Sequence, residues 1–460
     1  MSINNISRIA ILAVSVGALS SCHIYNKFDL LTDTPVTAEY AEARDASIDS
    51  AAYGNLQWQD VFTDPFLAEL IDRALVNNKD LNNAKLNVDM AHAQLKGARL
   101  SYLPSLTFNP NGSGASYDHS TINWTYQIPI AVSWEIDLFG KLLNADRKAK
   151  ASLLQSQAYE QAVRSQIIGG VANCYYTIAM LEKQLQISRQ TAEYWAESVE
   201  VMKNLKLAGR VNESAVVQST ANYYSILGSI TDLEVSLHEA NNTMSLLMNE
   251  MPHSWDIPAD ATFSTPEILR EGIPMKELAS RPDVRAAEQS LAAAYYTTNE
   301  ARAAFYPGLT ISSNGGFTNL LGSFISNPGK WFIQLAGQLT QPIFARGKLI
   351  ANLEATKAQQ QQAMNNFEYT LLSASAEVSD ALMLYTKSQE KAAFLEKQVE
   401  NLEKSVEYTE ELLSLNGSST YLEVLTAQQS LLSAQISQVA CENAKARAAI
   451  NLYQSLGGGR

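Results

Sequence analysis

The segment Thr121–Phe139 constrains the fold more than any other part of the chain. Its even positions are all apolar, and its odd positions up to Asp137 are polar or small, which is the period of a β-strand with two opposite faces. The apolar positions are Ile122, Trp124, Tyr126, Ile128, Ile130, Val132, Trp134, Ile136 and Leu138. Aromatic side chains flank an aliphatic centre, as on lipid-facing strands with aromatic girdles. Because a spanning strand needs about 9–11 residues, this segment can cross a membrane and continue beyond it.

The N-terminus looks like the signal of a bacterial lipoprotein. The apolar run Ile9–Leu19 has about half the length of a spanning helix and follows a short segment that carries Arg8. Leu19-Ser20-Ser21-Cys22 resembles a lipobox, so we predict that residues 1–21 are removed and that Cys22 carries lipid. By the same resemblance, His23 in place of Asp favours the outer membrane. A plain signal peptide with a chance cysteine is the alternative.

Composition and motifs argue against several other classes of protein. The chain has 460 residues and a net charge of −13, which disfavours a nucleic-acid partner. No GxxxxGK[ST], HExxH, CxxC or GxSxG motif occurs, and the five histidines are scattered, so we expect no enzyme, no cofactor and no metal site. A membrane hydrolase is the rival enzyme hypothesis. Cys174 and Cys441 lie in helical patterns and are interpreted as buried thiols rather than a disulfide.

Helical periodicity follows the N-terminal segment. Phe28–Tyr53 shows little periodicity and is read as an extended connector. Helical spacing begins near Pro65, is sustained over Asn77–Ser101, and stops before Pro104. Ser105–Asn109 alternates like a strand, the turn chemistry of 109–114 follows, and the strand Thr121–Phe139 completes a hairpin.

Two further helices follow this hairpin. Leu142–Leu207 contains no proline and predicts a helix about 100 Å long, with a possible bend at Gly169-Gly170. After a turn at 208–212, Glu213–Asn249 returns over only about 55 Å. The helix Asn77–Ser101, about 37 Å long, matches the missing length. We therefore infer that this short helix and the return helix stack end to end beside the long one.

The same order of elements then begins again. Three landmarks recur at a spacing of a little over 200 residues, which indicates an internal duplication. The landmark pairs are 98–107 with 301–310, 139–142 with 344–349, and 207–209 with 415–417. The second unit is expected to contain a helix Pro282–Ala304, strands Leu309–Phe317 and Trp331–Ile343, a long helix Lys348–Leu415 and a return helix Tyr421–Gln454. A coiled-coil seam follows Leu395, Val399, Leu402, Val406, Thr409 and Leu413.

The predicted domain organisation follows from these patterns. It comprises a signal peptide (1–21), a lipid-anchored connector (22–64), a first repeat (65–250) with a strand hairpin (104–139) and a helical hairpin (141–249), a linker (251–280), a second repeat (281–456) with a strand hairpin (307–343) and a helical hairpin (348–456), and a tail (457–460). Four membrane strands cannot close a barrel, because the smallest such barrels have eight strands and open edges are not tolerated in lipid. Two copies would give a barrel filled by side chains, whereas three give twelve strands and room for water. A trimer is the smallest conducting assembly.

Together these features resemble the TolC-like outer membrane factors, in particular the lipid-anchored NodT/OprM-like members of tripartite efflux systems. The resemblance covers essentially the whole mature chain. It implies a mainly α fold with a membrane β-barrel: a homotrimer whose 12-stranded β-barrel continues into a 12-helix periplasmic α-barrel. It implies a periplasmic adaptor (membrane fusion) protein and an inner-membrane RND-type transporter as partners, and outer membrane lipid around the barrel. A tunnel for type I protein secretion and a non-conducting envelope-spanning adaptor are the alternatives.

The resemblance also suggests roles for single residues. Gly209 and Gly417 stand where the family's helical tips face the adaptor, although glycine could simply permit the turn. Glu423 matches the first of two acidic residues that narrow the periplasmic mouth, whereas Thr426 and Ala215 depart from the acidic pattern. Glu423 could equally be a solvated surface residue. The expected membrane girdle comprises Trp124, Tyr126, Trp134 and Trp331.

Overall fold

The computed structural model describes residues 23–45, 56–116, 118, 120–261, 278–318, 330–414 and 421–459. The predicted signal peptide, Cys22, Gly417 and much of the predicted linker 251–280 lie outside these residues. The chain forms two compact units. Unit 1 comprises Met1–Leu31, Leu86–Gln157 and Arg285–Tyr369, and unit 2 comprises Thr32–Lys85, Ala158–Val284 and Thr370–Arg460.

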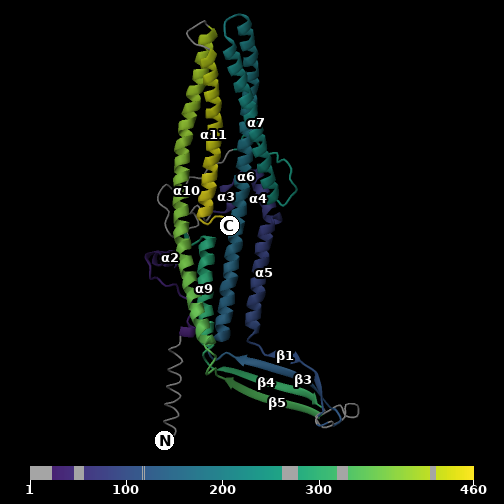
Figure 1. Cartoon of the computed structure of the whole chain (residues 1–460). Helices are drawn as coiled ribbons and strands as arrows, with labels where there is room; N and C mark the ends of the chain where they lie inside the picture. The colour runs from purple at the N-terminus through teal and green to yellow at the C-terminus, as the bar shows by residue number, and fades with distance from the viewer. Residues whose placement is uncertain are drawn as a thin grey trace. The chain divides into compact units, whose positions relative to one another are not determined.

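Helices make up most of the described structure, and all the long strands belong to unit 1 (Figure 1). In chain order the elements are η1 (His23–Tyr25), α2 (Pro35–Asp45), α3 (Trp58–Val61), α4 (Pro65–Asn77), α5 (Lys79–Leu100), β1 (Ser105–Phe108), β2 (Asn111–Ala115), β3 (Asn123–Ile136), α6 (Lys141–Leu207), α7 (Glu213–Leu247), α9 (Pro282–Ala303), β4 (Gly308–Thr318), β5 (Lys330–Thr340), α10 (Lys348–Ser414) and α11 (Tyr421–Ser455). No helix within the described residues combines the length and the apolar character that crossing a bilayer requires.

The helices of the two repeats have matching lengths. α6 and α10 each have 67 residues, α7 and α11 each have 35, and α5 and α9 each have 22. The six predicted helices are confirmed, with ends that agree to within two residues. Helices of equal length in the same order support the duplication inferred from the landmarks.

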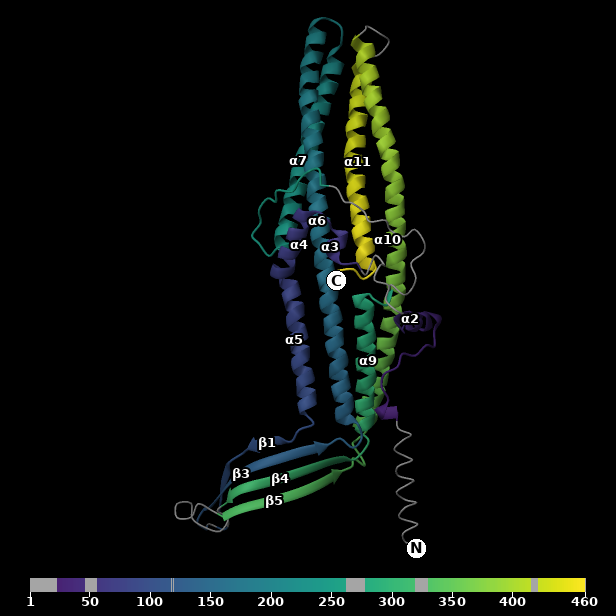
Figure 2. The same cartoon turned by 180° about the vertical axis from the view of Figure 1, so that it is seen from behind.

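Within unit 2, the long and return helices pack as hairpins, α6 beside α7 and α10 beside α11 (Figures 1 and 2). Leu185 and Trp195 of α6 share a buried cluster with Ile226 and Ile230 of α7, which Leu425 of α11 completes. Tyr385 of α10 packs on Ala448 and Ala449 of α11. Apolar stripes on neighbouring helices therefore hold the hairpins together.

The two cysteines in the described part of the chain are free and buried, as the sequence predicted. The Cys174 thiol donates to the carbonyl oxygen of Ala240 across the α6–α7 hairpin, at 3.3 Å. Burial raises the pKa of Cys174 to about 12, so this thiol stays protonated and unreactive at neutral pH.

Side chains at the start of the short helices confirm the inferred stacking. Asn78 precedes α5, and its Nδ2 donates to the carbonyl oxygen of Leu247, the last residue of α7, at 3.0 Å. Arg281 holds the same place before α9, and its Nη1 donates to the carbonyl oxygen of Ser455, the last residue of α11, at 2.6 Å. A carbonyl that the helix leaves unpaired at its C-terminus thus receives a donor from the next helix in the column.

The prediction of an extended connector over Phe28–Tyr53 is wrong for part of that segment, because Pro35–Asp45 is the helix α2. Thr34 caps its first turn, accepting from the amide of Thr37 through Oγ1 at 3.4 Å, and Pro35 occupies the first helical position. Tyr40 is fully buried. The helix has no clear apolar stripe, so periodicity alone did not reveal it, although Thr-Pro is a helix-start signal.

The strands form one antiparallel sheet in the order β1-β3-β4-β5, with β2 also paired to β3 (Figures 1 and 2). The predicted turn at 109–114 is wrong, because Asn111–Ala115 is the strand β2. Pro110 lacks an amide hydrogen and separates β1 from β2. Gly114 lies against the ring of Trp124, and a Cβ at this position would come within 3.1 Å of it. The glycine makes room for the tryptophan, and the chain reverses later, between Ala115 and Asn123.

Candidate functional site

One face of the sheet is apolar and open to the surroundings. Directly paired residues of antiparallel strands point to the same side, so the register carries the even positions of β3 across the sheet. Val132 pairs with Leu106 and Ser313, and Ser313 pairs with Leu335. The apolar side chains exposed on this face are Leu106, Phe108, Trp124, Ile128, Ile130, Trp134, Ile311, Phe317, Trp331, Ile333, Leu335 and Leu339. A patch of this size on a chain facing water would be unusual, so it marks an interaction with lipid or protein.

The opposite face is polar and almost uncharged. Its polar residues are Thr107, Thr125, Gln127, Ser133, Glu135, Thr310, Ser312, Asn314, Gln334 and Gln338. Its apolar residues are the small Pro129, Ala131 and Ala336 and the large Phe332. Glu135 forms an ion pair with Lys141, at 2.8 Å, where β3 leads into α6. A lipid-facing side and a water-facing side are what the strands of a transmembrane channel require.

Both edges of the sheet are unpaired within the described residues. Among the described strands, β5 pairs with β4 alone, and β1 and β2 both pair with β3 alone. The backbone groups on the outer sides of these strands therefore lack ladder partners, which lipid does not tolerate. The non-conducting adaptor hypothesis, which needs no such sheet, loses its support here.

The four predicted girdle residues lie on the apolar face, at its two ends. Trp124, Tyr126 and Trp331 lie at the end farther from the helices, and Trp134 lies near the start of α6. Trp134 has a second role, because its Nε1 donates to the carbonyl oxygen of Tyr102 at 2.9 Å. This bond ties β3 to the chain that follows α5.

Gly209 occupies the turn between α6 and α7 with a φ of +72°, a conformation that side chains disfavour. Its amide donates to Lys206, and the amide of Arg210 donates to Leu205, both at 2.9 Å. These two bonds form a Schellman motif with glycine at its left-handed position. The requirement for a turn therefore accounts for Gly209, whatever its role in binding.

Replacing this glycine should loosen the turn, whereas an alanine elsewhere in the hairpin should not. Gly209→Ala is expected to cost about 1 kcal/mol through its positive φ alone, since no atom of the described residues lies within 4 Å of the added Cβ. Gly228 is also uncrowded but lies inside α7, so Gly228→Ala should stabilise that helix by about 1 kcal/mol. Hydrogen exchange of the turn and of α7 measures both effects, and equal effects of the same sign would contradict this account.

Glu423 lies in the first turn of α11, where the helix dipole favours a carboxylate. Glu423 and Thr426 are both exposed and lie on the same side of the helix, three residues apart. Thr426 is neutral, and its hydroxyl donates to the carbonyl oxygen of Leu422 at 2.8 Å, so this position adds no charge to the surface. Glu423 is the acidic residue in the first turn of this helix.

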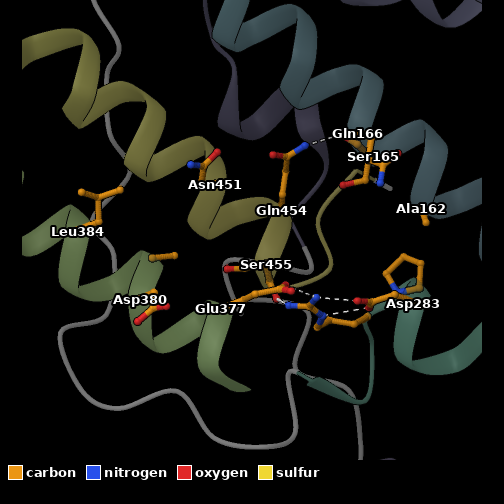
Figure 3. A pocket seen from close by; sticks show the side chains of 13 residues that line it. Ala162, Ser165, Gln166, Asp283, Glu377, Asp380, Leu384, Asn451, Gln454 and Ser455 are labelled. Atoms are coloured by element: carbon orange, nitrogen blue, oxygen red, sulfur yellow. Dashed lines mark hydrogen bonds and ion pairs between the residues drawn. The ribbon is translucent and has the colours of Figure 1, made fainter. Parts of the chain in front are cut away.

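A pocket of about 570 Å³ in unit 2, lined mostly by polar and charged residues, was not anticipated from the sequence (Figure 3). Arg281 lies at its wall, with a side chain that is 6% exposed. Its guanidinium binds both carboxylate oxygens of Asp283, at 3.0 and 2.7 Å, and one oxygen of Glu377 on α10, at 2.7 Å. Gln454 of α11 donates to the carbonyl oxygen of Ser165 on α6, at 2.9 Å. These bonds join four helices, so we interpret the pocket as a structural joint.

The sequence profile of the outer membrane efflux protein family matches residues 70–250 and 273–458. The chain belongs to this family. The cation efflux system protein CusC of Escherichia coli O6:H1 is 29% identical over 433 residues, which cover 92% of this chain and 93% of CusC. The toluene efflux pump outer membrane protein TtgC of Pseudomonas putida is 27% identical over an alignment 471 residues long, which covers 97% of this chain and 95% of TtgC. The probable outer membrane lipoprotein SilC of Salmonella typhimurium is 29% identical over 417 residues, which cover 89% of each chain.

Solved structures show the same fold. A crystal structure of CusC superposes with a TM-score of 0.79 at 27% identity and covers 90% of this chain and 97% of that chain. The open state of the MtrE outer membrane channel of Neisseria gonorrhoeae superposes with a TM-score of 0.81 at 28% identity and covers 90% and 94%. The resemblance to TolC-like outer membrane factors is thereby confirmed. This member of the outer membrane efflux protein family is a bacterial outer membrane protein that serves efflux.

Proposed function

We propose that the chain is the outer membrane channel-tunnel of a tripartite efflux pump. In this role it passively conducts substrates from an inner-membrane RND-type transporter and a periplasmic adaptor to the outside. The observation that carries the proposal is the sheet, which has one exposed apolar face, one polar face and two unpaired edges within the described residues. Such a sheet becomes stable in lipid only when its edges are closed by other copies.

Three copies satisfy this requirement and leave a channel. β1 with β2 fills one strand position, and β3, β4 and β5 fill the others, so each chain contributes four positions and three chains contribute twelve. The edge β5 of one copy pairs with the β1–β2 edge of the next, which closes the barrel by cyclic symmetry. The polar face then lines the lumen and the apolar face meets lipid.

The helices of three chains can be counted in the same way as the strands. Each chain supplies four helical columns: α6, α10, α7 stacked on α5, and α11 stacked on α9. Three chains therefore supply a twelve-helix tunnel. Each long helix of 67 residues is about 100 Å long, which suits a conduit across the periplasm.

Lipid at Cys22 and partners at the helical tips complete the proposal. SilC is named as a probable outer membrane lipoprotein, and this name supports lipidation of Cys22 in the present chain. Gly209 and Gly417 are assigned to the adaptor-facing tips, and the four aromatic residues Trp124, Tyr126, Trp134 and Trp331 to the membrane girdle. CusC is named for cations and TtgC for toluene, so relatives of similar sequence serve different cargo. We assign the choice of cargo to the inner-membrane partner.

Imaging of the detergent-purified full-length chain by electron microscopy tests the assembly. We expect a threefold particle with a helical part near 100 Å long and a barrel at one end. Planar-bilayer recordings of the same preparation should show single-channel conductance. A particle without threefold symmetry, or a trimer that does not conduct, would contradict the proposed channel.

Charge at Glu423 provides a test of the proposed periplasmic aperture. In the trimer three copies of Glu423 would surround the axis, and an acidic ring favours cations. Glu423→Gln should lower the cation-to-anion permeability ratio about twofold or more. Glu442→Gln, which removes the same charge farther along α11, is the control. An unchanged reversal potential and unchanged cation block in Glu423→Gln would exclude an aperture at this residue.

A further inference from the structure

A short N-terminal segment, Ile24–Leu30, is fastened to the place in unit 1 where β3 passes into α6. This place, called the first corner, comprises Leu138–Arg147. Tyr25 donates its hydroxyl to the carbonyl oxygen of Leu138, at 2.6 Å. Asn144 donates from Nδ2 to the carbonyl oxygen of Ile24, at 3.0 Å, and Arg147 donates from Nη1 to the carbonyls of Tyr25 and Asn26, at 2.9 and 3.0 Å.

The contact is buried at its centre and closely fitted. Asn144 is 0% exposed and Ile24 is 4% exposed. Gly140 has a φ of +72°, and a Cβ at this position would lie 3.3 Å from the ring of Tyr25 and 3.4 Å from Ile24. The buried carbonyl of Ile24 needs a donor, which Asn144 supplies, whereas Arg147 binds the carbonyls of the more exposed Tyr25 and Asn26.

The segment also reaches the second repeat. The amide of Phe28 donates to the hydroxyl of Tyr296 on α9, at 3.0 Å. The ring of Phe28 packs edge-on against Tyr295, with centroids 5.8 Å apart. The segment therefore joins α6 of one repeat to α9 of the other inside unit 1.

The duplicated corner provides an internal comparison. The sequence Gly140-Lys141-Leu142 recurs as Gly347-Lys348-Leu349, and Gly347 has a similar φ of +76°. At the positions that correspond to Asn144 and Arg147, the second repeat has Ala351 and Glu354. Within the described residues, no atom lies within 4 Å of a Cβ built at Gly347. The two donors thus occur only in the repeat whose corner receives the segment.

We propose that Asn144 and Arg147 are positioning residues for the lipid anchor. The proposal rests on the lipidation of Cys22 in the proposed function. Cys22 precedes Ile24 by two residues, so covalent geometry keeps it within about 7 Å of Ile24. The docked segment therefore holds the acyl chains at the helix-proximal end of the sheet, beside the end of the apolar face that carries Trp134. The lipid anchor and the strands of one chain are thereby held together at the same leaflet. This raises the chance that strand edges of different copies meet there.

The test uses the full-length chain expressed in a bacterial host. The N-terminal peptide is analysed by mass spectrometry for lipid, and the outer membrane fraction is analysed for SDS-resistant oligomer. The double variant Asn144→Ala/Arg147→Ala should remain lipidated, while its oligomer yield falls about tenfold through loss of the three hydrogen bonds to the segment. It also loses the bond from Asn144 to the carbonyl oxygen of Gly140 within the corner, and the insertions described below do not touch that bond. Glu354→Ala at the second corner is the matched control and should retain the wild-type yield.

Two insertions separate positioning of the anchor from simple stabilisation of the fold. Ten Gly/Ser residues inserted after His23 leave the lipobox and the docked segment intact but release the lipid from the corner. The same insertion after Asp33, beyond the segment, is the control. We expect a lower oligomer yield only for the insertion after His23. If the double variant loses oligomer and the insertion after His23 does not, the segment merely stabilises the fold and the proposal is wrong.

The outcome is distinguishable from failure of the proposed channel function. A wild-type N-terminal peptide without lipid would overturn the positioning role, whereas bilayer conductance of the oligomer would still support the channel. Lipidated oligomers that do not conduct would overturn the channel and leave the positioning result standing.

Discussion

Replacing Leu335 by arginine should keep the protein from assembling in the outer membrane, whereas arginine at the neighbouring Gln334 should be tolerated. Leu335 lies at the middle of β5 on the apolar face, and Gln334 points to the polar face. A cation near the bilayer midplane of a barrel costs about 2–4 kcal/mol on the lipid side, and this cost would arise in each of three copies. The two substitutions add the same charge one residue apart, so a difference between them reports on the face alone.

This pair distinguishes a lipid-facing sheet from a sheet that faces water. The Leu335 side chain is 74% exposed in the single chain, so in water its replacement would remove little packing and would change stability by less than about 0.5 kcal/mol. The measurement is the fraction of SDS-resistant oligomer in outer membranes. Equal yields for Leu335→Arg, Gln334→Arg and the wild type would contradict the assignment of the faces. The Gln334→Arg oligomer should also become more selective for anions, because the added charge lies in the lumen.

The sequence predicted the main elements because each of them has a local pattern. The alternation around Ile128 and Val132 gave both faces of β3, and uninterrupted helical spacing gave α6 and α10 almost to the residue. Duplication of the landmarks gave the second repeat. The local exceptions arose where one residue type has two uses, since Gly114 looks like a turn residue but makes room for Trp124.

The joints between helices could not be predicted in the same way. Arg281 precedes Pro282 and could be read as an ordinary residue at a helix start, yet its partners Glu377 and Ser455 lie 96 and 174 residues away. The docking of Tyr25 on Leu138 spans 113 residues. Such contacts depend on tertiary structure, and no periodicity within a window reports them. The duplication indicates only that Asn78 and Arg281 correspond, because each directly precedes the short helix of its repeat.

Removing the carboxylates around Arg281 should destabilise unit 2 more than removing Arg281 itself. The guanidinium is 6% exposed, whereas the side chains of Asp283 and Glu377 are 46% and 54% exposed. Asp283→Asn/Glu377→Gln leaves a buried charge without a counter-charge, at a cost of about 3–5 kcal/mol. Arg281→Met removes that charge, lets both carboxylates turn to water, and leaves the Ser455 carbonyl without its donor, at about 1–3 kcal/mol.

Hydrogen exchange of the first turn of α9 and the last turn of α11, in the detergent-solubilised full-length protein, measures these opening free energies. Asn78→Ala, which breaks the neutral joint of the first repeat, is the control and should loosen α5 without affecting α9. If the opening free energy falls less in the double carboxylate variant than in Arg281→Met, the buried guanidinium does not need its counter-charges.

The same joint should respond to acid in a defined direction. Burial opposes the charged form of Asp283, but hydrogen bonds and charge from Arg281 outweigh it, so the pKa of Asp283 lies below its ordinary value. A group with a lowered folded-state pKa contributes stability above its unfolded pKa and loses that contribution as the pH falls through the folded value. After correction for intrinsic rates, hydrogen exchange at the start of α9 should therefore not change between pH 7 and 5. It should accelerate below about pH 4, where Asp283 begins to lose its charge. Asp283→Asn removes the titrating group, so the acid-dependent part should disappear in that variant, and its persistence would assign the acid response to other carboxylates.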